Sequence, residues 1–411
     1  MHVVIFEGRH WPTFAPLSLG RPVFMLGTGT STLLEKQIRA LAPSRLTLWV
    51  RPEMADYARQ RIVPRLGIPA AVNEPLDDEM ACVMSGRTLH LQEFEHRTDE
   101  SVVVEEHDVI MEATVRRPGL APDDILHRTS KWTDLLELPQ APSQSVLVEY
   151  LWDLVKYNEE SLMADFAALK IKSQPRKAGH YHVVEEENIW LAENVKIAPG
   201  VVLDGSQGPV MIDKSASIGA NAVIAGPCYI GSYASISPLA SIRPGTSIGM
   251  MSKVGGEVSN SIMFGYSNKA HDGFLGDSYV GKWVNLGAGT TTSNLKNTYG
   301  EITARGGEGE VKTGRRFLGS LIGDHAKTAI GSRLMAGTYL GFSSMLATSQ
   351  IAPKLVPSFT FMTDNGPDPY RLDKAKEVMQ AVFKRRDRAW QEPDDWITDY
   401  VARTAPAIER A

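Results

Sequence analysis

The sequence has few cysteines and no strong excess of charge of either sign. Cys82 and Cys228 are its two cysteines in 411 residues, and they lie too far apart to form a metal-binding pair. So low a cysteine content is typical of a reducing compartment. The 43 basic and 48 acidic residues give a formal net charge of −5, which does not indicate binding to nucleic acid.

Long apolar runs are also missing. No stretch approaches the roughly 18 apolar residues that a membrane-spanning helix requires. The opening residues, MHVVIFEGRHWP, lack the basic start and apolar centre of a secretory signal and are typical of a first buried strand. We therefore expect a cytoplasmic protein without a membrane partner.

The first 172 residues combine short buried strands with helical patterns. HVVIF (2–6) and RLTLWV (45–50) are strand-like, and STLLEKQIRAL (31–41) between them has the spacing of an amphipathic helix. Strand, helix and strand in this order predict an α/β domain with a parallel, Rossmann-like sheet. Helices over 145–170 close this predicted domain of residues 1–172.

Further along, aliphatic residues recur at every sixth position: Ile212, Ile218, Ile224, Ile230, Ile236, Ile242, Ile248 and Val254. This period is too long for strand alternation and does not match a helix. A fixed period of this kind indicates a solenoid. We predict a parallel β-helix of hexapeptide repeats over residues 173–360, with each aliphatic residue pointing into the core.

The period stops after residue 360, and residues 361–411 have the spacing of helices. This pattern predicts a C-terminal helical tail that packs against the solenoid or a neighbouring subunit. Its basic run, KRR at 384–386, has two interpretations: a phosphate or nucleic-acid patch, or a solvated helical face. We favour the second, because short charge runs are usually solvated.

The segment YSNKAHDGFLGD (266–277) interrupts this regular pattern and introduces His271. Together with the residues that follow, it matches H-x-x-[YF]-L-G-D…N-x-G-A-G-T-x-x-x-N at His271, Phe274, Leu275, Gly276, Asp277, Asn285, Gly287, Ala288, Gly289, Thr290 and Asn294. This segment resembles the acetyltransferase domain of the bifunctional enzymes that acetylate glucosamine-1-phosphate and then make UDP-N-acetylglucosamine. The similarity is close from about 236 to 296, and the whole chain resembles a divergent branch of that family. The resemblance implies a left-handed β-helix, a homotrimer and an active site between subunits.

Acetyl transfer to an amino sugar requires a base, because the ammonium group must lose a proton before it attacks a thioester. Histidine titrates near neutral pH and suits this role. His271 is therefore the candidate general base. A histidine that only satisfies hydrogen bonds in an irregular loop is the alternative.

The resemblance also assigns candidate substrate-binding residues. Arg243 matches the position that binds the sugar phosphate, where a guanidinium fork suits phosphate oxygens; a surface arginine at a solenoid turn is the alternative. Asn285 and Asn294 match positions that contact sugar or cofactor, although stacked asparagines inside a solenoid turn also fit this pattern.

Two positions depart from the family pattern. Ser259 stands where the family has a phosphate-binding lysine, and Phe274 stands where it usually has a tyrosine. Losing a cation weakens phosphate binding or signals a different acceptor. Lys253 and Lys269 are the nearby candidates to restore the charge.

Acetyl-CoA is the cofactor that the resemblance implies. It would lie along the later coils, with Ala347 and Thr348 as candidate contacts. The glycine-rich insertion 298–316 would either clamp the CoA phosphates through Arg315 and Arg316 or form a mobile hairpin.

The first domain resembles the family's nucleotidyltransferase domain only in outline. Arg9, Arg21 and the GTG at 27–29 are the candidate nucleotide-binding residues, but the closely spaced glycines of the family's first loop are missing. Arg87 stands where the family has an aspartate that binds magnesium. We therefore expect Mg²⁺ only if this domain is active, and no other metal.

These patterns predict an acetyl-CoA-dependent N-acetyltransferase acting on an amino-sugar phosphate or an amino nucleotide-sugar. Coupling to sugar-1-phosphate nucleotidyl transfer in nucleotide-sugar biosynthesis stays open. The alternatives are a sugar-1-phosphate nucleotidyltransferase whose β-helix serves trimerisation or regulation, and a non-catalytic trimeric scaffold. A zinc enzyme is disfavoured because paired histidine spacing is missing. The identities of the sugar and of the acyl group stay open.

Overall fold

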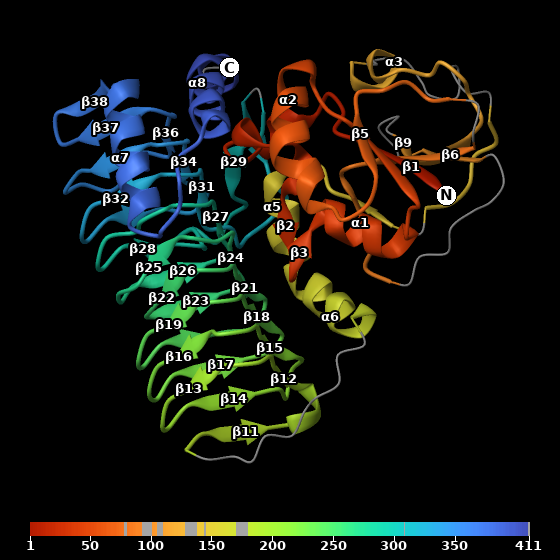
Figure 1. The fold of residues 1–411 in the computed structure, drawn as a ribbon. Helices are drawn as coiled ribbons and strands as arrows, with labels where there is room; N and C mark the ends of the chain where they lie inside the picture. Colours follow the sequence, from red (N-terminus) through yellow and green to blue (C-terminus); the bar gives the residue numbers. More distant parts are fainter. Residues whose placement is uncertain are drawn as a thin grey trace.

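The computed structural model describes residues 1–77, 80–92, 101–104, 110–127, 138–143, 145–169, 180–307 and 309–409. An α/β domain, a long β-solenoid and a helical C-terminal tail follow one another along the chain (Figure 1). The predicted fold class is therefore confirmed. The predicted boundary between residues 172 and 173 lies outside the described residues.

The first domain is built on a six-stranded sheet in the order β5-β4-β1-β6-β9-β8. β1, β4, β5 and β6 run parallel to one another, while β9 runs antiparallel to both β6 and β8. The strands are β1 (His2–Phe6), β4 (Arg45–Trp49), β5 (Ala70–Val72), β6 (Ala81–Ser85), β8 (Ser101–Val104) and β9 (Ile110–Val115). Two small ribbons pair β2 (Gly27–Thr28) with β3 (Ser31–Thr32), and β7 (Thr88–Leu89) with β10 (Val146–Leu147).

The helices of this domain are α1 (Leu33–Leu41), α2 (Ala55–Tyr57), α3 (Pro122–Leu126), α5 (Leu151–Lys156) and α6 (Asn158–Ala168). A capping box fixes the start of α1. The Thr32 hydroxyl accepts from the Glu35 amide, and the Glu35 carboxylate accepts from the Thr32 amide. Two of the free N–H groups at the helix start are thereby satisfied.

The solenoid has three parallel walls. The first wall contains β11 (His182–Val184), β14 (Val202–Asp204), β17 (Val223–Ala225), β20 (Ser241–Ile242), β23 (Glu257–Ser259) and β26 (Phe274–Gly276). The second contains β12 (Ile189–Leu191), β15 (Val210–Ile212), β18 (Cys228–Ile230), β21 (Thr246–Ile248), β24 (Ile262–Met263), β27 (Tyr279–Val280), β31 (Leu321–Ile322), β34 (Tyr339–Leu340) and β36 (Leu355–Val356). The third contains β13 (Lys196–Ile197), β16 (Ser217–Ile218), β19 (Ser235–Ile236), β22 (Lys253–Val254) and β25 (Asn268–Lys269), and later β32 (Lys327–Thr328), β35 (Met345–Ala347) and β37 (Thr360–Thr363). β38 (Gly366–Pro369) extends this wall antiparallel to β37.

The six-residue repeat arises because each wall contributes one inward-facing side chain per coil. In the second wall Ile212, Ile230 and Ile248 lie in register above one another, and all three are buried. Comparable columns in the other two walls complete a continuous aliphatic core. The burial of this core stabilises every coil by the hydrophobic effect.

The shortened coils lie just before the histidine segment rather than in it. Successive inward positions are Val254, Val258, Met263, Lys269 and Leu275, so the spacing falls to four and five residues and then returns to six. The interruption expected over 266–277 is therefore displaced towards the N-terminus. Within that segment the period is kept, and a lysine occupies one inward position.

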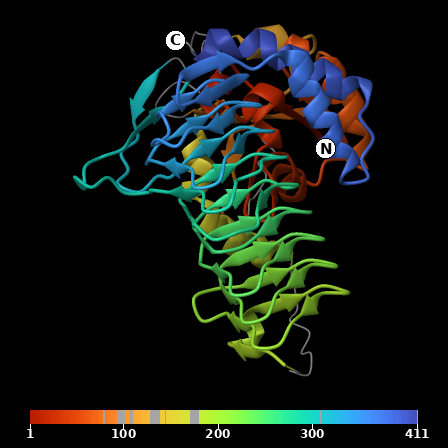
Figure 2. The same ribbon diagram turned by 90° about the vertical axis from the view of Figure 1, so that its left-hand side faces the viewer.

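Two later segments depart from the solenoid. Past β28 (Thr291–Thr292), which pairs with β33 (Arg333–Leu334), the insertion folds as a hairpin of β29 (Thr303–Arg305) and β30 (Glu310–Lys312) that extends from the solenoid (Figure 2). The tail forms α7 (Leu372–Lys384) and α8 (Glu392–Glu409), which lie across the last coils. Within the described part of the chain, no helix is long and apolar enough to cross a membrane.

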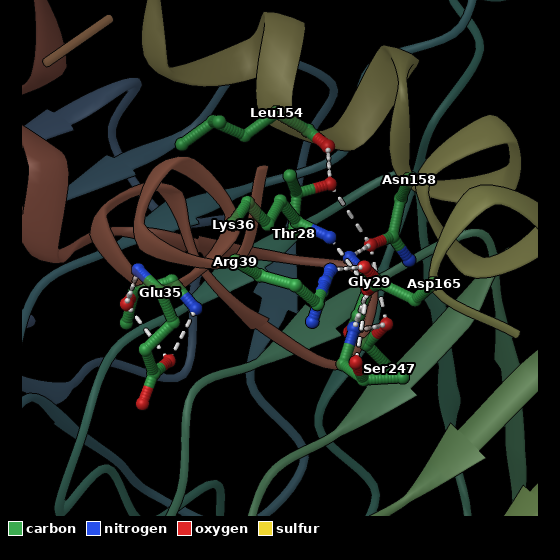
Figure 3. Close-up of polar contacts among 11 residues, drawn as sticks. Thr28, Gly29, Glu35, Lys36, Arg39, Leu154, Asn158, Asp165 and Ser247 are labelled. Carbon is green, nitrogen blue, oxygen red and sulfur yellow. Dashed lines mark hydrogen bonds and ion pairs between the residues drawn. The ribbon is translucent and has the colours of Figure 1, made fainter. Parts of the chain in front are cut away.

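Polar contacts at the turn between β2 and β3 join the first domain to the solenoid (Figure 3). The side-chain oxygen of Asn158 accepts from the Gly29 amide at 2.7 Å and from the Thr28 hydroxyl at 3.2 Å. Its side-chain nitrogen donates to the main-chain oxygen of Gly245 at 2.7 Å, and the Ser247 hydroxyl donates to that of Gly29 at 2.7 Å. The GTG segment thus forms part of the interface with the solenoid.

A charged cluster next to this turn is centred on Asp165 of α6. Its carboxylate pairs with Lys36 and Arg39 of α1 and accepts from the Thr30 amide at 2.8 Å (Figure 3). Asp165 and Lys36 are only 1% and 4% exposed. Burial lowers the pKa of Lys36, and the Asp165 charge opposes that shift. The cluster therefore holds α1 against α6 through a buried ion pair.

The three parts of the chain also share apolar cores. Phe14, Leu17 and Leu26 of the first domain pack in one cluster with Ile262 and Tyr279 of the solenoid. A second cluster combines the face of the first sheet with side chains from the last coils and from both tail helices. The tail thus packs against both the solenoid and the first domain of its own chain.

We expect Asp165→Asn to lower the free energy of unfolding by about 3–5 kcal/mol, because it leaves the buried Lys36 ammonium without its partner. Asp56→Asn is the matched control. It breaks an ion pair with Arg59 in which the Asp56 side chain is 81% exposed, and should cost at most about 1 kcal/mol. Urea unfolding followed by circular dichroism measures both variants. Equal effects would contradict a structural role for the Asp165 cluster.

Candidate active site

His271 lies in the turn between β25 and β26, where the chain passes from the third wall to the first. Its side chain is exposed and borders two separate hollows of about 740 and 380 Å³. Both hollows are also lined by Ala270 and Ala288. The imidazole can therefore contact a ligand in either hollow.

Lys269 fixes the position of this turn from inside the solenoid. It pairs in register with Val254, so it takes an inward position that aliphatic residues occupy in the neighbouring coils of this wall. Its ammonium donates to the main-chain oxygens of Gly255 at 2.6 Å and His271 at 3.0 Å. Burial lowers the pKa of Lys269 to about 8, while Asp272 and Glu257 oppose that shift. The lysine acts on the main chain of His271 and does not point to the surface position of Ser259.

Gly273 is required by the same turn. Its φ is +123°, and a Cβ atom there would lie 2.1 Å from the main-chain oxygen of Thr290. Any other residue would displace one of the two chain segments. The histidine turn is thus held by a buried lysine on one side and by a close backbone approach on the other.

The larger hollow, which we call the His271 cleft, is enclosed between the third wall and helix α7. Val378, Ala381 and Val382 of α7 form one apolar side. Asn285 lies opposite them and accepts from the Asn268 side chain at 3.2 Å.

Four cationic side chains line the His271 cleft: Lys253, Lys327, Arg385 and Arg386. No carboxylate appears among the described residues of its lining. Burial lowers the pKa of Lys327 to about 8, and Arg386 donates to Asn268 at 2.7 Å. The cleft is therefore suited to a ligand that carries negative charge.

The smaller hollow is open and lined by turns of consecutive coils. Ser237, Pro238, Gly255 and Gly256 form one side, and Gly289 lies on the other. Main-chain groups lie there beside the Ser237 hydroxyl and the Asp272 carboxylate. They suit a ligand with several hydroxyls.

The other predicted substrate-binding residues lie along the first wall. Asn294 donates to the Asp277 carboxylate at 2.5 Å, and Asn260 donates to the other oxygen of the same group at 2.6 Å. Phe274 and Ser259 belong to the adjacent strands β26 and β23.

Arg243 is half-exposed on the same wall and pairs with Glu257 at 2.7 Å. Of the predicted substrate-binding set, only Asn285 lines the cleft together with His271.

The predicted cofactor contacts are scattered. Ala347 is exposed in β35, and the Thr348 hydroxyl donates to Asp364 at 2.5 Å. Arg315 donates to the main-chain oxygen of Trp152 in α5 at 3.0 Å, which ties the insertion to the first domain. None of these three residues lines the His271 cleft.

Sequence reasoning considered Lys269 only as a replacement for the charge missing at Ser259, and it did not connect Arg385 and Arg386 with His271. The interpretation of KRR as a solvated face fits the exposed Lys384 but not Arg386, which is half-buried against the solenoid. No sequence signal joins residues about a hundred positions apart. The buried lysine, however, was detectable as a charge at an inward position of the repeat.

In the first domain, the carboxyl ends of β1 and β4 are closed by a buried ion pair between Glu7 and Arg51. The Arg51 guanidinium lies between the rings of Trp11, at 4.0 Å, and Tyr400, at 5.6 Å. Arg87 follows β6 and is buried, which lowers its pKa to about 10.

The two predicted nucleotide-binding arginines differ in burial and in their partners. Arg9 is exposed and donates to His10 at 3.1 Å. Arg21 is buried and pairs with Asp324 of the solenoid.

Comparisons with known proteins agree with both halves of this architecture. The sugar nucleotidyl transferase family matches residues 3–174. The chain is 32% identical to YaiX, an uncharacterized acetyltransferase of Escherichia coli (strain 536 / UPEC), over 171 residues, which are 41% of this chain and 74% of YaiX.

Two bifunctional proteins are similar over shorter shares of their length. The bifunctional protein GlmU of Synechococcus sp. (strain CC9311) is 27% identical over 203 residues, 49% of this chain and 38% of that protein. A bifunctional sugar-1-phosphate nucleotidylyltransferase/acetyltransferase of Sulfurisphaera tokodaii is 33% identical over 160 residues, 38% of this chain and 40% of that protein. The chain therefore spans less than half of either bifunctional relative.

The low pKa of Lys269 predicts a pH-dependent difference in stability. Between pH 8 and 10 the unfolded chain keeps this proton, whereas the folded chain, with a pKa of about 8, has lost it. Stability rises with pH where the unfolded state binds more protons. As the pH rises, the free energy of unfolding of the natural protein should therefore increase relative to that of Lys269→Met, by up to about 1 kcal/mol per pH unit.

Urea unfolding at pH 8, 9 and 10 measures this difference. The matched control is Lys253→Met, at an exposed lysine of the neighbouring coil. It should follow the natural protein at all three pH values. A Lys269→Met difference that stays constant with pH would show that this lysine has an ordinary pKa.

Proposed function

The chain belongs to a divergent branch of the GlmU-like family of sugar nucleotidyltransferases and acetyltransferases, and on this premise we propose that it is an acetyl-CoA-dependent N-acetyltransferase. Its acceptor would be an amino-sugar phosphate or an amino nucleotide-sugar. The observation that carries the proposal is the position of His271, exposed between a cation-lined cleft and a smaller polar hollow.

His271 would act as the general base. An imidazole nitrogen would take the proton from the ammonium group of the acceptor, since histidine changes charge near neutral pH. The Lys269 ammonium holds the main-chain oxygen of His271 at 3.0 Å, so the imidazole is projected from a fixed turn. Lys269 is thus a positioning residue rather than a catalytic one.

The charges of the His271 cleft support acetyl-CoA as the acyl donor. Acetyl-CoA supplies the acetyl group as a thioester and carries several phosphates. Arg385, Arg386, Lys253 and Lys327 would hold those phosphates, because a cleft lined by one sign of charge favours the opposite charge. The volume of about 740 Å³ is within the usual range for a ligand site. Helix α7 would then cover the site that binds acetyl-CoA.

The smaller hollow would receive the amino sugar. Asn285 could contact the acceptor from the cleft side, because it lines the cleft together with His271. Arg243 would bind an acceptor phosphate only after exchanging its present partner, Glu257. With Ser259 in place of the family's lysine, we expect this part of the site to bind an acceptor phosphate weakly.

A homotrimer in the cytoplasm completes the proposal. Leu239 and Ile330 are 75% and 79% exposed on the solenoid, and Ile330 also lines the His271 cleft. Burying such side chains between subunits would stabilise an oligomer. Size-exclusion chromatography with light scattering determines the number of chains.

Sugar-1-phosphate nucleotidyl transfer is the second candidate activity, and the match of residues 3–174 to the sugar nucleotidyl transferase family favours it. Mg²⁺ would be needed there. The Glu7–Arg51 pair and Arg87 at the ends of the central strands oppose it, because they leave no free carboxylate among the described residues at these positions. Release of pyrophosphate from nucleoside triphosphates by the purified protein tests it.

We expect His271→Ala to lower kcat for the release of CoA thiol by at least about 100-fold, since general-base catalysis contributes 10²–10⁴-fold. The assay uses acetyl-CoA with a panel of amino sugars, their phosphates and amino nucleotide-sugars. His182→Ala, at an exposed histidine of the first solenoid strand, is the control and should keep full activity. Unchanged turnover in His271→Ala would refute the assigned base.

We expect Arg385→Ala to raise KM for acetyl-CoA about tenfold with little change in kcat, because it removes one phosphate contact from the cleft. Lys384→Ala is the matched control, since that side chain is exposed and does not line the cleft. A KM unchanged in Arg385→Ala, or raised equally in both variants, would place the donor elsewhere.

A further inference from the structure

A second cavity of about 620 Å³ lies where the first domain, the solenoid and the tail meet. We call it the junction cavity. Arg21, Arg61 and Arg65 reach it from the first domain, Lys282 and His325 from the solenoid, and Arg388 from the segment between α7 and α8. The cavity therefore exists only in the fully assembled chain.

The charge of the junction cavity is positive. Five lysine and arginine side chains line it, against three carboxylates. Arg21 is paired with Asp324, and Arg61 is paired with Asp394 at 2.6 Å. Neither Lys282 nor Arg65 has a carboxylate partner within the described part of the chain. Two cations are thus left to face the cavity.

Buried donors at the cavity are also left without acceptors. In the described residues, the donors Arg21 Nη1 and Trp390 Nε1 are enclosed and form no hydrogen bond, and His325 Nδ1, whose role depends on the tautomer, forms none either. Arg21 and His325 are only 8% and 7% exposed. Leaving a buried polar group unsatisfied is unfavourable, and more so when the group is charged. Two unsatisfied donors beside one polar cavity point to a ligand rich in acceptor oxygens.

Lys282 and Arg21 approach the same aromatic ring. The Lys282 ammonium lies 4.6 Å from the ring centroid of Phe264, and the Arg21 guanidinium carbon lies 5.0 Å from it. Burial, followed by the positive charge of Arg21, lowers the pKa of Lys282 to about 8, and Asp324 opposes the shift. Two cations held this close are stabilised by an anion between or beside them.

We propose that the junction cavity binds a small phosphate-bearing anion through Arg21, Lys282 and Arg65. A phosphate offers several acceptor oxygens in a compact group, which matches the planar donors of arginine and the point charge of lysine. The site differs from the His271 cleft and goes beyond the proposed acetyl transfer. The two cavities are separated by the stacked rings of Tyr266 and Trp283, whose centroids lie 4.3 Å apart and which line both.

Isothermal titration calorimetry of the full chain tests this site, with pyrophosphate and ATP as separate probes and with no acyl donor or acceptor present. We expect both probes to bind the natural protein and Lys282→Met to weaken binding at least tenfold. Equal affinity for the two probes indicates recognition of the phosphates alone, and tighter binding of ATP indicates a nucleotide; either result supports the proposal.

Lys384→Met is the matched control because Lys384 is exposed and lines neither cavity, and it should bind the probes as the natural protein does. Lys253→Met removes a cation of the His271 cleft alone and therefore reports binding of the probes in that cleft. Arg65→Met, at an exposed residue, is the second variant and should also weaken binding. It keeps the test valid should Lys282→Met fold poorly by circular dichroism. No binding to the natural protein, or a loss in Lys253→Met alone, would overturn the proposal. Neither result depends on the activity of His271.

Discussion

Every coil of the solenoid must supply one inward-facing side chain per wall, and this constraint governs the rest of the molecule. Aliphatic residues meet it in most coils, and their burial provides the stability of the column. Lys269 meets it differently: its stem takes the place of an aliphatic side chain, and its ammonium reaches main-chain oxygens at the corner. A charge in the core is costly unless it is hydrogen-bonded. The Lys269 ammonium is hydrogen-bonded in this way at the corner that carries His271.

Both cavities form where parts of the chain dock against the solenoid. The solenoid alone has open walls, while α7 closes the His271 cleft and the first domain together with the tail closes the junction cavity. The first domain is fixed in turn by contacts such as that between Ser247 and Gly29 and by apolar packing against Tyr279. The Asp165 cluster lies next to the same turn and lines neither cavity.

Much of the fold was predictable because its signals are local or periodic. The strands at 2–6 and 45–50, the helix at 31–41 and the six-residue column follow from short patterns, and the histidine motif follows from a resemblance. The contact of Arg386 with Asn268 and the pairing of Arg21 with Asp324 could not be predicted, because they join residues more than a hundred positions apart. The displaced interruption was missed for a local reason: Val258 and Met263 continue the inward column at shortened spacing.

The carboxyl edge of the first sheet weighs against nucleotide binding there. Ligands of doubly wound sheets bind beyond the carboxyl ends of parallel strands. Here Glu7 and Arg51 pair at that edge, and Tyr400 of the tail accepts from Arg51 Nε at 3.0 Å. A ligand at this place would have to separate a buried ion pair, which costs about 3–5 kcal/mol when one partner is lost. The tail thus closes this edge of the sheet through Tyr400 of α8, and neither cavity is lined by Glu7, Arg51 or Tyr400.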